Sequence, residues 1–259
     1  MQQATILKGM TEAAIEAGKI LRKMYTDNSA VSLQKGKDYY DVVSKADLMS
    51  EERILKILKK TAPGVNILSE EKGFIDQNAP DTIVIDPLDG SSNFLLGIPH
   101  FSVSMAYVRG GEILASIVYN PISDRMYVAQ KGKGVLLNKK KLKPVTAKKV
   151  QSVAVNFSHK SKWVDKGPFF DQAYAMGIPR VMNNWSPNLD FCLLAENKIN
   201  AVVSIDSLIF DFAPGVLIAT ESGCFKTPKL TLQEVGVHTT RRFIVADKKK
   251  LAVELNGLI

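Results

Sequence analysis

The sequence is poor in the residues that build redox centres, zinc sites and disulfide frameworks. It contains only two cysteines, Cys192 and Cys224, and three histidines, none of them at zinc-ligand spacing. It also has no run of about 18 apolar residues, so we expect no membrane span. A metal site would have to be built from aspartate and glutamate, whose oxygen ligands favour hard cations such as Mg²⁺.

The remaining composition is typical of a globular protein. Of the 259 residues, 46% are hydrophobic and 23% are charged, which leaves little room for disorder. This length predicts one large domain or two small ones with an extensive core. The N-terminus lacks an apolar signal core, so we expect a cytoplasmic protein.

The formal net charge is +8, and the basic residues that produce it are not clustered in one segment. The lysines are scattered, with short runs only at 139–141 and 248–250. A solvated basic face explains this pattern more simply than a nucleic-acid patch. A small phosphorylated substrate is equally compatible with the charge.

Two helices followed by an antiparallel sheet are predicted for the first half. Apolar residues recur at helical spacing through the first 25 residues, and a second helix follows Asp47, which can cap it. Pro63 and Gly64 end that helix. Turn signals then separate short apolar segments that predict strands at 65–68, 82–85, 101–108, 112–119 and 126–129.

Alternating strands and helices are predicted for the second half. Strand-like segments lie at 153–157, 201–205 and 243–246, and helical segments lie at 189–196, 211–221 and 247–255. This alternation favours an α/β half, so the fold class is α/β or α+β. The lysine-rich stretch 139–149 is the candidate boundary, which divides the chain into residues 1–145 and 146–259.

The stretch from Ile85 to Phe94 carries the strongest chemical signal. An apolar strand ends at Asp86, and Asp89 follows within one turn, so both carboxylates can converge on one point. Two buried carboxylates at that distance repel strongly unless a cation lies between them. Gly90 permits close approach of the backbone to a ligand, and a helix opening at Ser91 would present N–H groups to an anion. The pattern favours metal-assisted phosphate hydrolysis over a simple turn with a helix cap.

Three further acidic segments are weaker candidates. Residues 69–71, Ser-Glu-Glu, follow an apolar run, and a solvated acidic turn explains them more simply. Asp211 stands at the expected start of a helix with Pro214 in its first turn, where a cap and a metal ligand are equally good interpretations. Asp47 either caps the second helix or lies behind the metal site.

In their order along the chain, these motifs resemble the inositol monophosphatase family, whose superfamily includes fructose-1,6-bisphosphatases and phosphoadenosine phosphatases. The two metal-binding signatures of the family resemble Asp-Pro-Leu-Asp-Gly-Ser-Ser-Asn-Phe at 86–94 and Phe-Asp-Phe-Ala-Pro-Gly at 210–215. Three shorter family motifs resemble residues 41–47, 69–71 and 129–138. The resemblance implies a layered α-β-α-β-α sandwich.

The resemblance also implies a role for each site residue. The metal ligands would be four carboxylates and one carbonyl: Glu70, Asp86, Asp89, Asp211 and the Leu88 carbonyl. The catalytic residues would be Glu70, Ser91, which replaces the usual threonine and orients the attacking water, and Asp47, which would hydrogen-bond near that hydroxyl. The substrate-binding residues would be Asp89, Gly90, Ser91 and Ser204. Two or three Mg²⁺ ions per site would activate the water and neutralise the leaving oxygen.

The departures from the family pattern all lie in the second half. Phe210 replaces a tryptophan and Pro214 replaces an alanine. Ser204 stands where inositol-handling members carry a glutamate for sugar hydroxyls, and Trp185 stands where the family has glycine in a stretch that lines the pocket. Asp206 is a candidate for the missing carboxylate, although a turn residue is the simpler interpretation.

The function predicted is a Mg²⁺-dependent phosphomonoesterase that acts on a small polyol or sugar phosphate. One alternative is a phosphatase of a nucleotide or of fructose bisphosphate. The other is a regulatory protein of the SuhB-like extragenic suppressor branch, which binds transcription machinery; the basic charge suits this alternative without requiring it. Family members are commonly homodimers, so the resemblance also implies a homodimer, and no membrane partner is expected.

Overall fold

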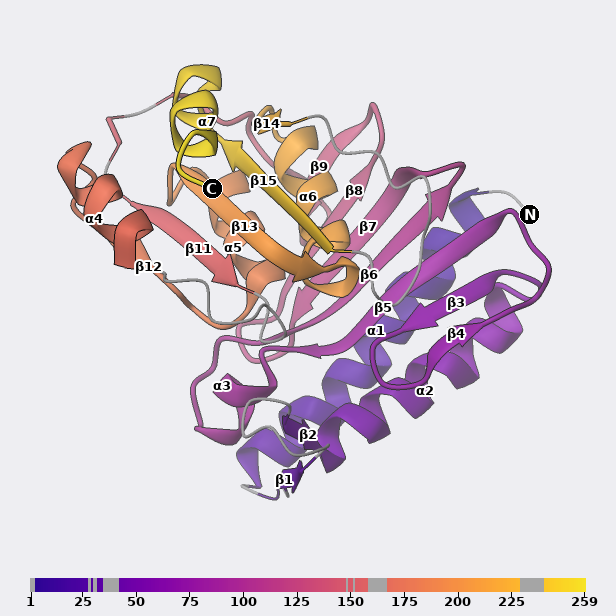
Figure 1. Ribbon diagram of the computed structural model, residues 1–259. Helices are drawn as coiled ribbons and strands as arrows, with labels where there is room; N and C mark the ends of the chain where they lie inside the picture. The colour runs from indigo at the N-terminus through magenta and orange to yellow at the C-terminus, as the bar shows by residue number, and fades with distance from the viewer. Residues whose placement is uncertain are drawn as a thin grey trace.

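A computed structural model of the chain is shown in Figure 1. It describes residues 3–27, 29, 32–34, 42–147, 149–150, 152–157, 167–228 and 240–259. Asp41, the first residue of one family motif, lies outside the described residues, as do His159 and His238.

The first half consists of helices on an eight-stranded sheet. The helices are α1 (Gln3–Thr26), α2 (Lys45–Thr61) and the short α3 (Ser91–Leu95). The sheet has the order β10-β9-β8-β7-β6-β5-β3-β4. Its strands are β3 (Asn66–Ser69), β4 (Gly73–Ile75), β5 (Asp81–Asp89), β6 (Ser102–Arg109), β7 (Glu112–Asn120), β8 (Arg125–Gln130), β9 (Gly134–Leu137) and β10 (Lys140–Lys141). A separate two-stranded sheet pairs β1 (Ser32–Gln34) with β2 (Val42–Ser44).

The second half is built on a five-stranded sheet of order β12-β11-β13-β15-β14. Its strands are β11 (Val153–Phe157), β12 (Val181–Met182), β13 (Ala201–Leu208), β14 (Phe225–Thr227) and β15 (Thr240–Ala246). The helices of this half are α4 (Gly167–Ala175), α5 (Pro187–Ala195), α6 (Ile209–Glu221) and α7 (Lys249–Asn256). No described helix is both long enough and apolar enough to cross a membrane.

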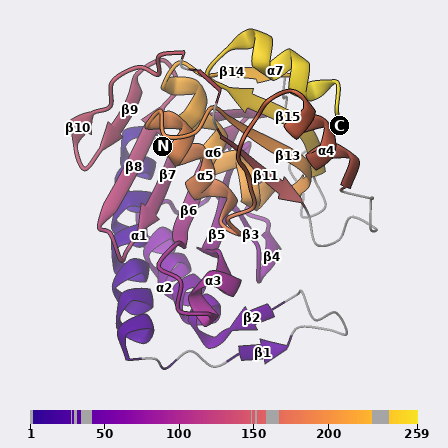
Figure 2. The same cartoon turned by 90° about the vertical axis from the view of Figure 1, so that its left-hand side faces the viewer.

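The helices and the two larger sheets stack as five layers, which Figures 1 and 2 show from two sides. Apolar side chains of α1 and α2 pack on one face of the eight-stranded sheet. On its other face, Val84 and Ala106 share a core with Phe212 of α6 and Phe243 of the second sheet. A third core joins the far face of the second sheet to α4 and α7. The predicted α-β-α-β-α sandwich is confirmed, and α5 and α6 are its central layer.

The boundary near residue 145 stays a prediction. Within the described residues, every strand of the eight-stranded sheet precedes residue 142 and every strand of the five-stranded sheet follows residue 152. However, α6 packs on both sheets, and Tyr127 of β8 donates a 2.5 Å hydrogen bond to Glu196 at the end of α5. The two halves therefore share a core through the α5–α6 layer.

The predicted start of the second helix was wrong. The helix α2 begins at Lys45, and Ser44 is its N-cap, with Ser44 Oγ accepting hydrogen bonds from the N–H groups of Ala46 and Asp47. Asp47 is the third helical residue and accepts a 2.7 Å hydrogen bond from Ser44 N–H. This reciprocal capping box frees the second carboxylate oxygen of Asp47 for another partner.

Two other predictions need correction. The strand β3 runs parallel to β5, so the first sheet is not purely antiparallel. The helix α6 begins at Ile209, which places Pro214 inside the helix rather than in its first turn. A proline at that position cannot donate to the carbonyl of Phe210, four residues earlier. That carbonyl instead accepts a 2.9 Å hydrogen bond from Asn188 Nδ2.

The close packing of α5 on α6 yields a stability prediction. A Cβ added at Gly215 would lie 2.5 Å from the ring of Phe191, which is fully buried. We expect Gly215→Ala to lower the free energy of unfolding by about 1–3 kcal/mol, because overpacking outweighs the gain in helix propensity. Gly257→Ala is the control, since its Cβ would meet its nearest neighbour at 3.4 Å. Equal urea unfolding midpoints for the two variants would contradict this account.

Candidate active site

The strand β5 brings two carboxylates to the edge of the first sheet. Asp86 and Asp89 lie at its end, where pairing with β6 shifts register, and both side chains are buried. Asp86 Oδ1 accepts a 3.1 Å hydrogen bond from Leu88 N–H. Asp89 Oδ2 accepts hydrogen bonds from Ser102 Oγ at 3.1 Å and Ser186 Oγ at 2.7 Å. The irregular end of β5 therefore directs both carboxyl groups inward.

Glu70 reaches the same edge because β3 is the parallel neighbour of β5. Ser69, the last residue of β3, is aligned with Ile85, and Glu70 N–H donates to Ile85 O at 3.2 Å. Parallel strands end at the same edge of a sheet, so Glu70 follows β3 at the level where Asp86 follows Ile85. The acidic turn at 69–71 is therefore not a solvated surface feature.

The carboxyl groups influence one another strongly. Burial raises the pKa of Glu70, and the charge of Asp211 raises it further. Burial and then the charges of Glu70 and Asp89 raise the pKa of Asp86. Burial raises the pKa of Asp89 to about 8, with Asp211 adding to the rise. Among the described residues, no lysine or arginine is one of the largest influences on these three pKa values.

This donor set fits a hard divalent cation. Carboxylate oxygens and the nearby Leu88 carbonyl are the ligands that Mg²⁺ prefers, and the raised pKa values report negative charge that lacks compensation. The described residues contain no group of three or more histidine, cysteine or acidic side chains that is already arranged to hold an ion. The carboxylates instead accept protein hydrogen bonds, as Asp211 Oδ2 does from Leu208 N–H at 3.0 Å. The metal ligands therefore stay a prediction.

Ser91 and Asp47 are hydrogen-bonded across the site. Ser91 Oγ lies 2.6 Å from Asp47 Oδ1 and 3.0 Å from the carbonyl oxygen of Leu88. Because Ser44 binds the other oxygen of Asp47, the carboxylate is fixed on both sides. Burial is the largest cause of the raised pKa of Asp47, and both serine bonds oppose it. The structure thus places the Ser91 hydroxyl beside a predicted metal ligand.

Gly90 is required by its surroundings. Its φ is +99°, and an added Cβ would lie 3.0 Å from His100 O and 3.2 Å from Trp185 O. A side chain would therefore be both strained and crowded. The helix α3 begins at the next residue, Ser91, as the phosphate-cradle hypothesis requires.

Sequence reasoning missed one face of α2. Ser50 Oγ donates to Pro87 O at 2.6 Å, and Glu51 Oε1 accepts from Ser69 Oγ at 2.5 Å and from Lys72 N–H at 2.9 Å. Together with Asp47, these side chains repeat at the i, i+3, i+4 spacing of one helix face. The polar residues at this spacing on α2 were the sequence signal that could have indicated a helix face buried against the carboxyl groups of the site.

Sequence reasoning also missed the start of α5. Ser186 and the N–H of Asn188 both donate to Asp89 Oδ2, at 2.7 and 3.1 Å. These residues come from the second half of the chain, so Asp89 joins the two halves. No local pattern around Asp89 predicts partners about a hundred residues away.

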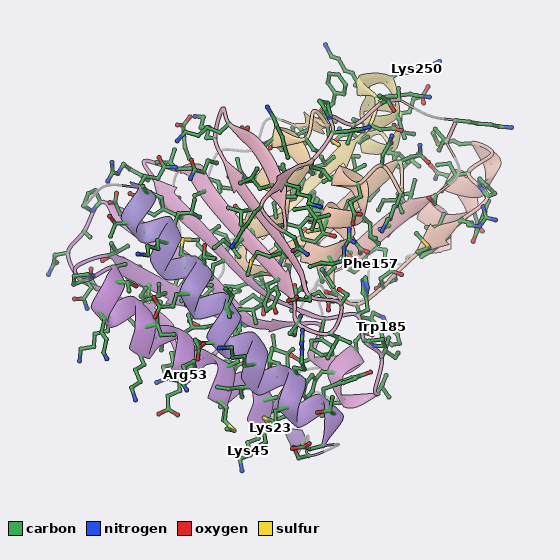
Figure 3. All side chains as sticks on the ribbon, turned by 180° about the vertical axis from the view of Figure 1, so that it is seen from behind. Lys23, Lys45, Arg53, Phe157, Trp185 and Lys250 are labelled. Carbon is green, nitrogen blue, oxygen red and sulfur yellow. The ribbon has the colours of Figure 1, made fainter. Side chains whose placement is uncertain are left out.

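The residues predicted for the substrate side lie in very different surroundings. Ser204 lies buried on β13 beside Asn156, and its Oγ has no hydrogen-bond partner among the described residues. Trp185 is half exposed with φ +55°, and Figure 3 shows its side chain at the molecular surface. Asp206 lies at a register shift with φ +53° and forms a bidentate pair with Arg242, both bonds at 2.7 Å. Asp206 therefore lies at an irregularity within β13 rather than in the predicted turn, and its carboxylate is held by Arg242.

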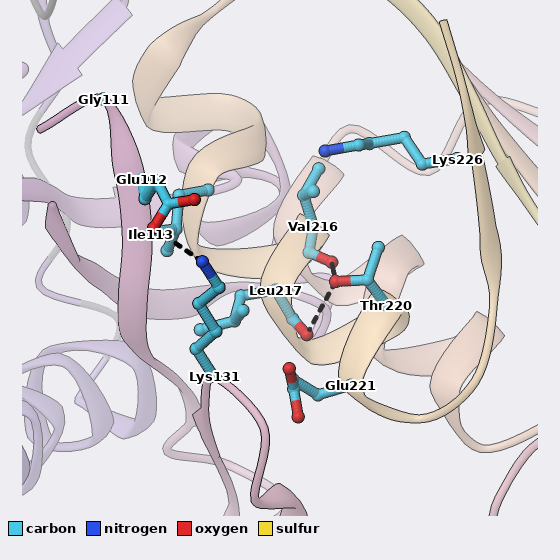
Figure 4. Close-up of a pocket in the computed structure, with 9 residues that line it drawn as sticks. All are labelled: Gly111, Glu112, Ile113, Lys131, Val216, Leu217, Thr220, Glu221 and Lys226. Carbon is cyan, nitrogen blue, oxygen red and sulfur yellow. Dashed lines mark hydrogen bonds and ion pairs between the residues drawn. The ribbon is translucent and has the colours of Figure 1, made fainter. Parts of the chain in front are cut away.

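A cavity of about 200 Å³ lies at the other end of α6 (Figure 4). It is lined by Gly111, Glu112, Ile113, Lys131, Val216, Leu217, Thr220, Glu221 and Lys226. Lys131 pairs with Glu112 at 2.6 Å. Glu221 accepts hydrogen bonds from the N–H groups of Gly132 and Gly134 at 2.8 and 2.9 Å. These bonds hold the turn between β8 and β9, which lies in the family motif at 129–138, against the end of α6 opposite Asp211.

The chain matches the inositol monophosphatase family over residues 2–258 and belongs to it. It is 33% identical to an inositol-1-monophosphatase of Rhizobium meliloti, covering 88% of this chain and 86% of the relative. It is also 33% identical to the Nus factor SuhB of Haemophilus influenzae, covering 82% and 80% of the two chains. Among solved structures, the extragenic suppressor protein suhB from Bartonella henselae has a TM-score of 0.83 and 27% identity, covering 98% and 97%. The predicted family, and with it a phosphatase as the class of enzyme, is confirmed.

The buried carboxyls predict how stability depends on pH. A carboxyl whose pKa is higher in the folded than in the unfolded state favours folding at low pH and loses that contribution as pH rises through the folded value. Burial raises the pKa of Asp89 from 3.8 to about 8 and that of Asp190 to about 7. We therefore expect the melting temperature of the metal-free protein to fall between pH 5 and 8. Added Mg²⁺ should recover more of it at pH 8 than at pH 5, because only ionised carboxylates bind the ion. Scanning calorimetry checks this, and a melting temperature that rises with pH without metal would contradict it.

Proposed function

We propose that the protein is a Mg²⁺-dependent phosphomonoesterase that hydrolyses a small polyol or sugar phosphate by direct attack of water. The observation that carries this proposal is the influence of the Asp211 charge on the pKa values of Glu70, Asp86 and Asp89, beside the Ser91–Asp47 pair. When bound, Mg²⁺ supplies a water of lowered pKa and neutralises charge on the leaving oxygen. Glu70, Asp86, Asp89, Asp211 and the Leu88 carbonyl would hold it.

The chain's own residues orient the reacting groups. The Ser91 hydroxyl donates its proton to Asp47, which leaves the lone pairs of Ser91 Oγ to accept a hydrogen bond from the attacking water. The N–H groups of Gly90 and Ser91 bind the phosphate oxygens, because Gly90 brings backbone rather than side chain to the substrate. No covalent phospho-enzyme is needed in this scheme.

A regulatory role is the second candidate. Relatives that are 31–33% identical carry the name Nus factor SuhB, and the net charge of +8 is compatible with a nucleic-acid-bound assembly. In this role the protein, a cytoplasmic homodimer, would bind transcription machinery without using its chemistry. Pull-down from a bacterial lysate with and without Mg²⁺ tests it, and failure to retain RNA polymerase in both conditions would reject it.

Metal-dependent hydrolysis gives the first functional prediction. We expect phosphatase activity to require Mg²⁺ and to disappear with a chelator. Asp89→Asn keeps an acceptor for Ser186 but removes a charge from the ligand set, so kcat/KM should fall at least about a hundredfold. Asp206→Asn is the control, since its carboxylate pairs with Arg242. Near wild-type kinetics for Asp89→Asn would show that the metal assignment is wrong.

The substrate side gives the second functional prediction. Ser204 lacks the carboxylate that would accept hydrogen bonds from a polyol, so we expect a lower kcat/KM for inositol monophosphate than for at least one other phosphate ester. A panel of sugar, polyol and nucleotide phosphates measures this.

Ser204→Glu should raise turnover of inositol monophosphate only when combined with Trp185→Gly, if both positions line one pocket. A wild-type preference for inositol monophosphate over every other ester would contradict the pocket argument. Absence of activity on the whole panel with Mg²⁺ would reject the proposed function itself.

A further inference from the structure

Asn188, at the start of α5, contacts one segment of the acidic site from each half of the chain: Asp89 of β5 and the first turns of α6. Its backbone N–H donates to Asp89 Oδ2 at 3.1 Å. Its side-chain Nδ2 donates to Phe210 O at 2.9 Å, and its Oδ1 accepts from Gly215 N–H at 3.0 Å. The residue is fully buried. One side chain therefore brackets the first turns of α6, which carry Asp211, while its own backbone binds Asp89.

The side-chain bonds of Asn188 are needed because of Pro214. In an unbroken α-helix the N–H of residue 214 would donate to the carbonyl of Phe210, but proline has no N–H and its ring displaces that carbonyl. Phe210 is only 1% exposed, so water does not replace the lost hydrogen-bond donor to its carbonyl. The Asn188 amide supplies the missing donor at this position.

We propose that Asn188 is a positioning residue that holds Asp211 opposite Asp89, and that the interruption of α6 by Pro214 makes it necessary. The family's Gly-Ser/Thr-Ala-Ala stretch falls on residues 185–188, so the resemblance implies alanine at 188 as well as at 214. Asn188 and Pro214 are therefore two departures from the family pattern, and the Asn188 side chain supplies the donor that Pro214 lacks. The proposal rests on the proposed function only for the identity of the ion. The coupling between Asn188 and Pro214 arises from their hydrogen bonding around Phe210 O and does not depend on any activity.

A double-mutant cycle tests the proposal, with direct Mn²⁺ binding measured by electron paramagnetic resonance and with melting temperatures. Asn188→Ala should weaken Mn²⁺ binding by about tenfold or more, the usual effect of losing a group that orients metal ligands. It should also lower the melting temperature, because Phe210 O and Gly215 N–H lose their partner. Pro214→Ala alone should stay close to the wild type, because residue 214 then donates to Phe210 O.

The double variant Asn188→Ala/Pro214→Ala tests directly whether Pro214 makes Asn188 necessary. With the helical bond restored, it should bind Mn²⁺ more tightly and melt at a higher temperature than Asn188→Ala alone, so the two changes are strongly non-additive. If Asn188→Ala is too unstable to purify, the double variant should still fold. Additive effects, or wild-type Mn²⁺ affinity in Asn188→Ala, would overturn the proposal.

Asn200→Ala is the matched control. Asn200 is also a buried amide, and it joins Ser152 N–H, at 3.3 Å, to Asp247, at 2.8 Å, away from the acidic site. It should lower the melting temperature without changing Mn²⁺ affinity. A wild type that binds no Mn²⁺ would reject the proposed function. In that case the melting temperatures of the Asn188→Ala and Pro214→Ala variants should still be non-additive.

Discussion

The repulsion between buried carboxyl groups is the constraint on which the rest of this structure depends. The charge of Asp211 raises the pKa values of Glu70, Asp86 and Asp89 at the edge of the first sheet, and the fold has to hold these groups there against that repulsion. Such an arrangement costs stability, which a protein retains at a functional site and offsets elsewhere. The extensive apolar cores on both faces of the first sheet supply that offset.

Three helices on opposite sides of the first sheet fix the acidic groups. From one side, α2 presents Asp47, Ser50 and Glu51 to the segments that carry Ser91, Asp86 and Glu70. From the other side, the first turn of α5 binds Asp89 and α6 carries Asp211. The carboxyl groups are therefore held by rigid elements rather than by loops, which keeps their geometry reproducible when a ligand enters.

Local patterns explain which parts of the site could be predicted from sequence. Residues 85–94 combine the end of an apolar strand, two carboxylates and a glycine within ten positions, so the chemistry is visible without knowledge of the fold. Glu70 was ambiguous because its importance comes from the parallel pairing of β3 with β5, which the sequence pattern did not predict.

The other wrong or missing predictions have two causes: another residue occupies the predicted position, or the hydrogen-bond partners are far apart in the sequence. Asp47 was a candidate for the cap, as well as for a place behind the metal site, because its residue type favours an N-cap. The N-cap is instead Ser44, three residues earlier. Asn188 escaped notice because its partners in α6 lie 22 and 27 residues away. The position of Pro214 was predicted wrongly for the same reason. A proline inside a helix leaves a carbonyl without its donor, and here the replacement donor comes from a distant part of the chain.

The pairing of Asn188 with the carbonyl of Phe210 also bears on how this chain diverged from its relatives. A carbonyl oxygen has two lone pairs, so Asn188 can bind Phe210 O even when residue 214 is an alanine that donates to it as well. Asparagine could therefore be acquired first at little cost. Proline acquired first would have left a buried carbonyl without a donor, a change that selection tends to remove. With both residues in place, Pro214→Ala leaves every one of these groups with a partner, whereas Asn188→Ala leaves the Phe210 carbonyl without a donor, so the two positions are constrained in one direction only.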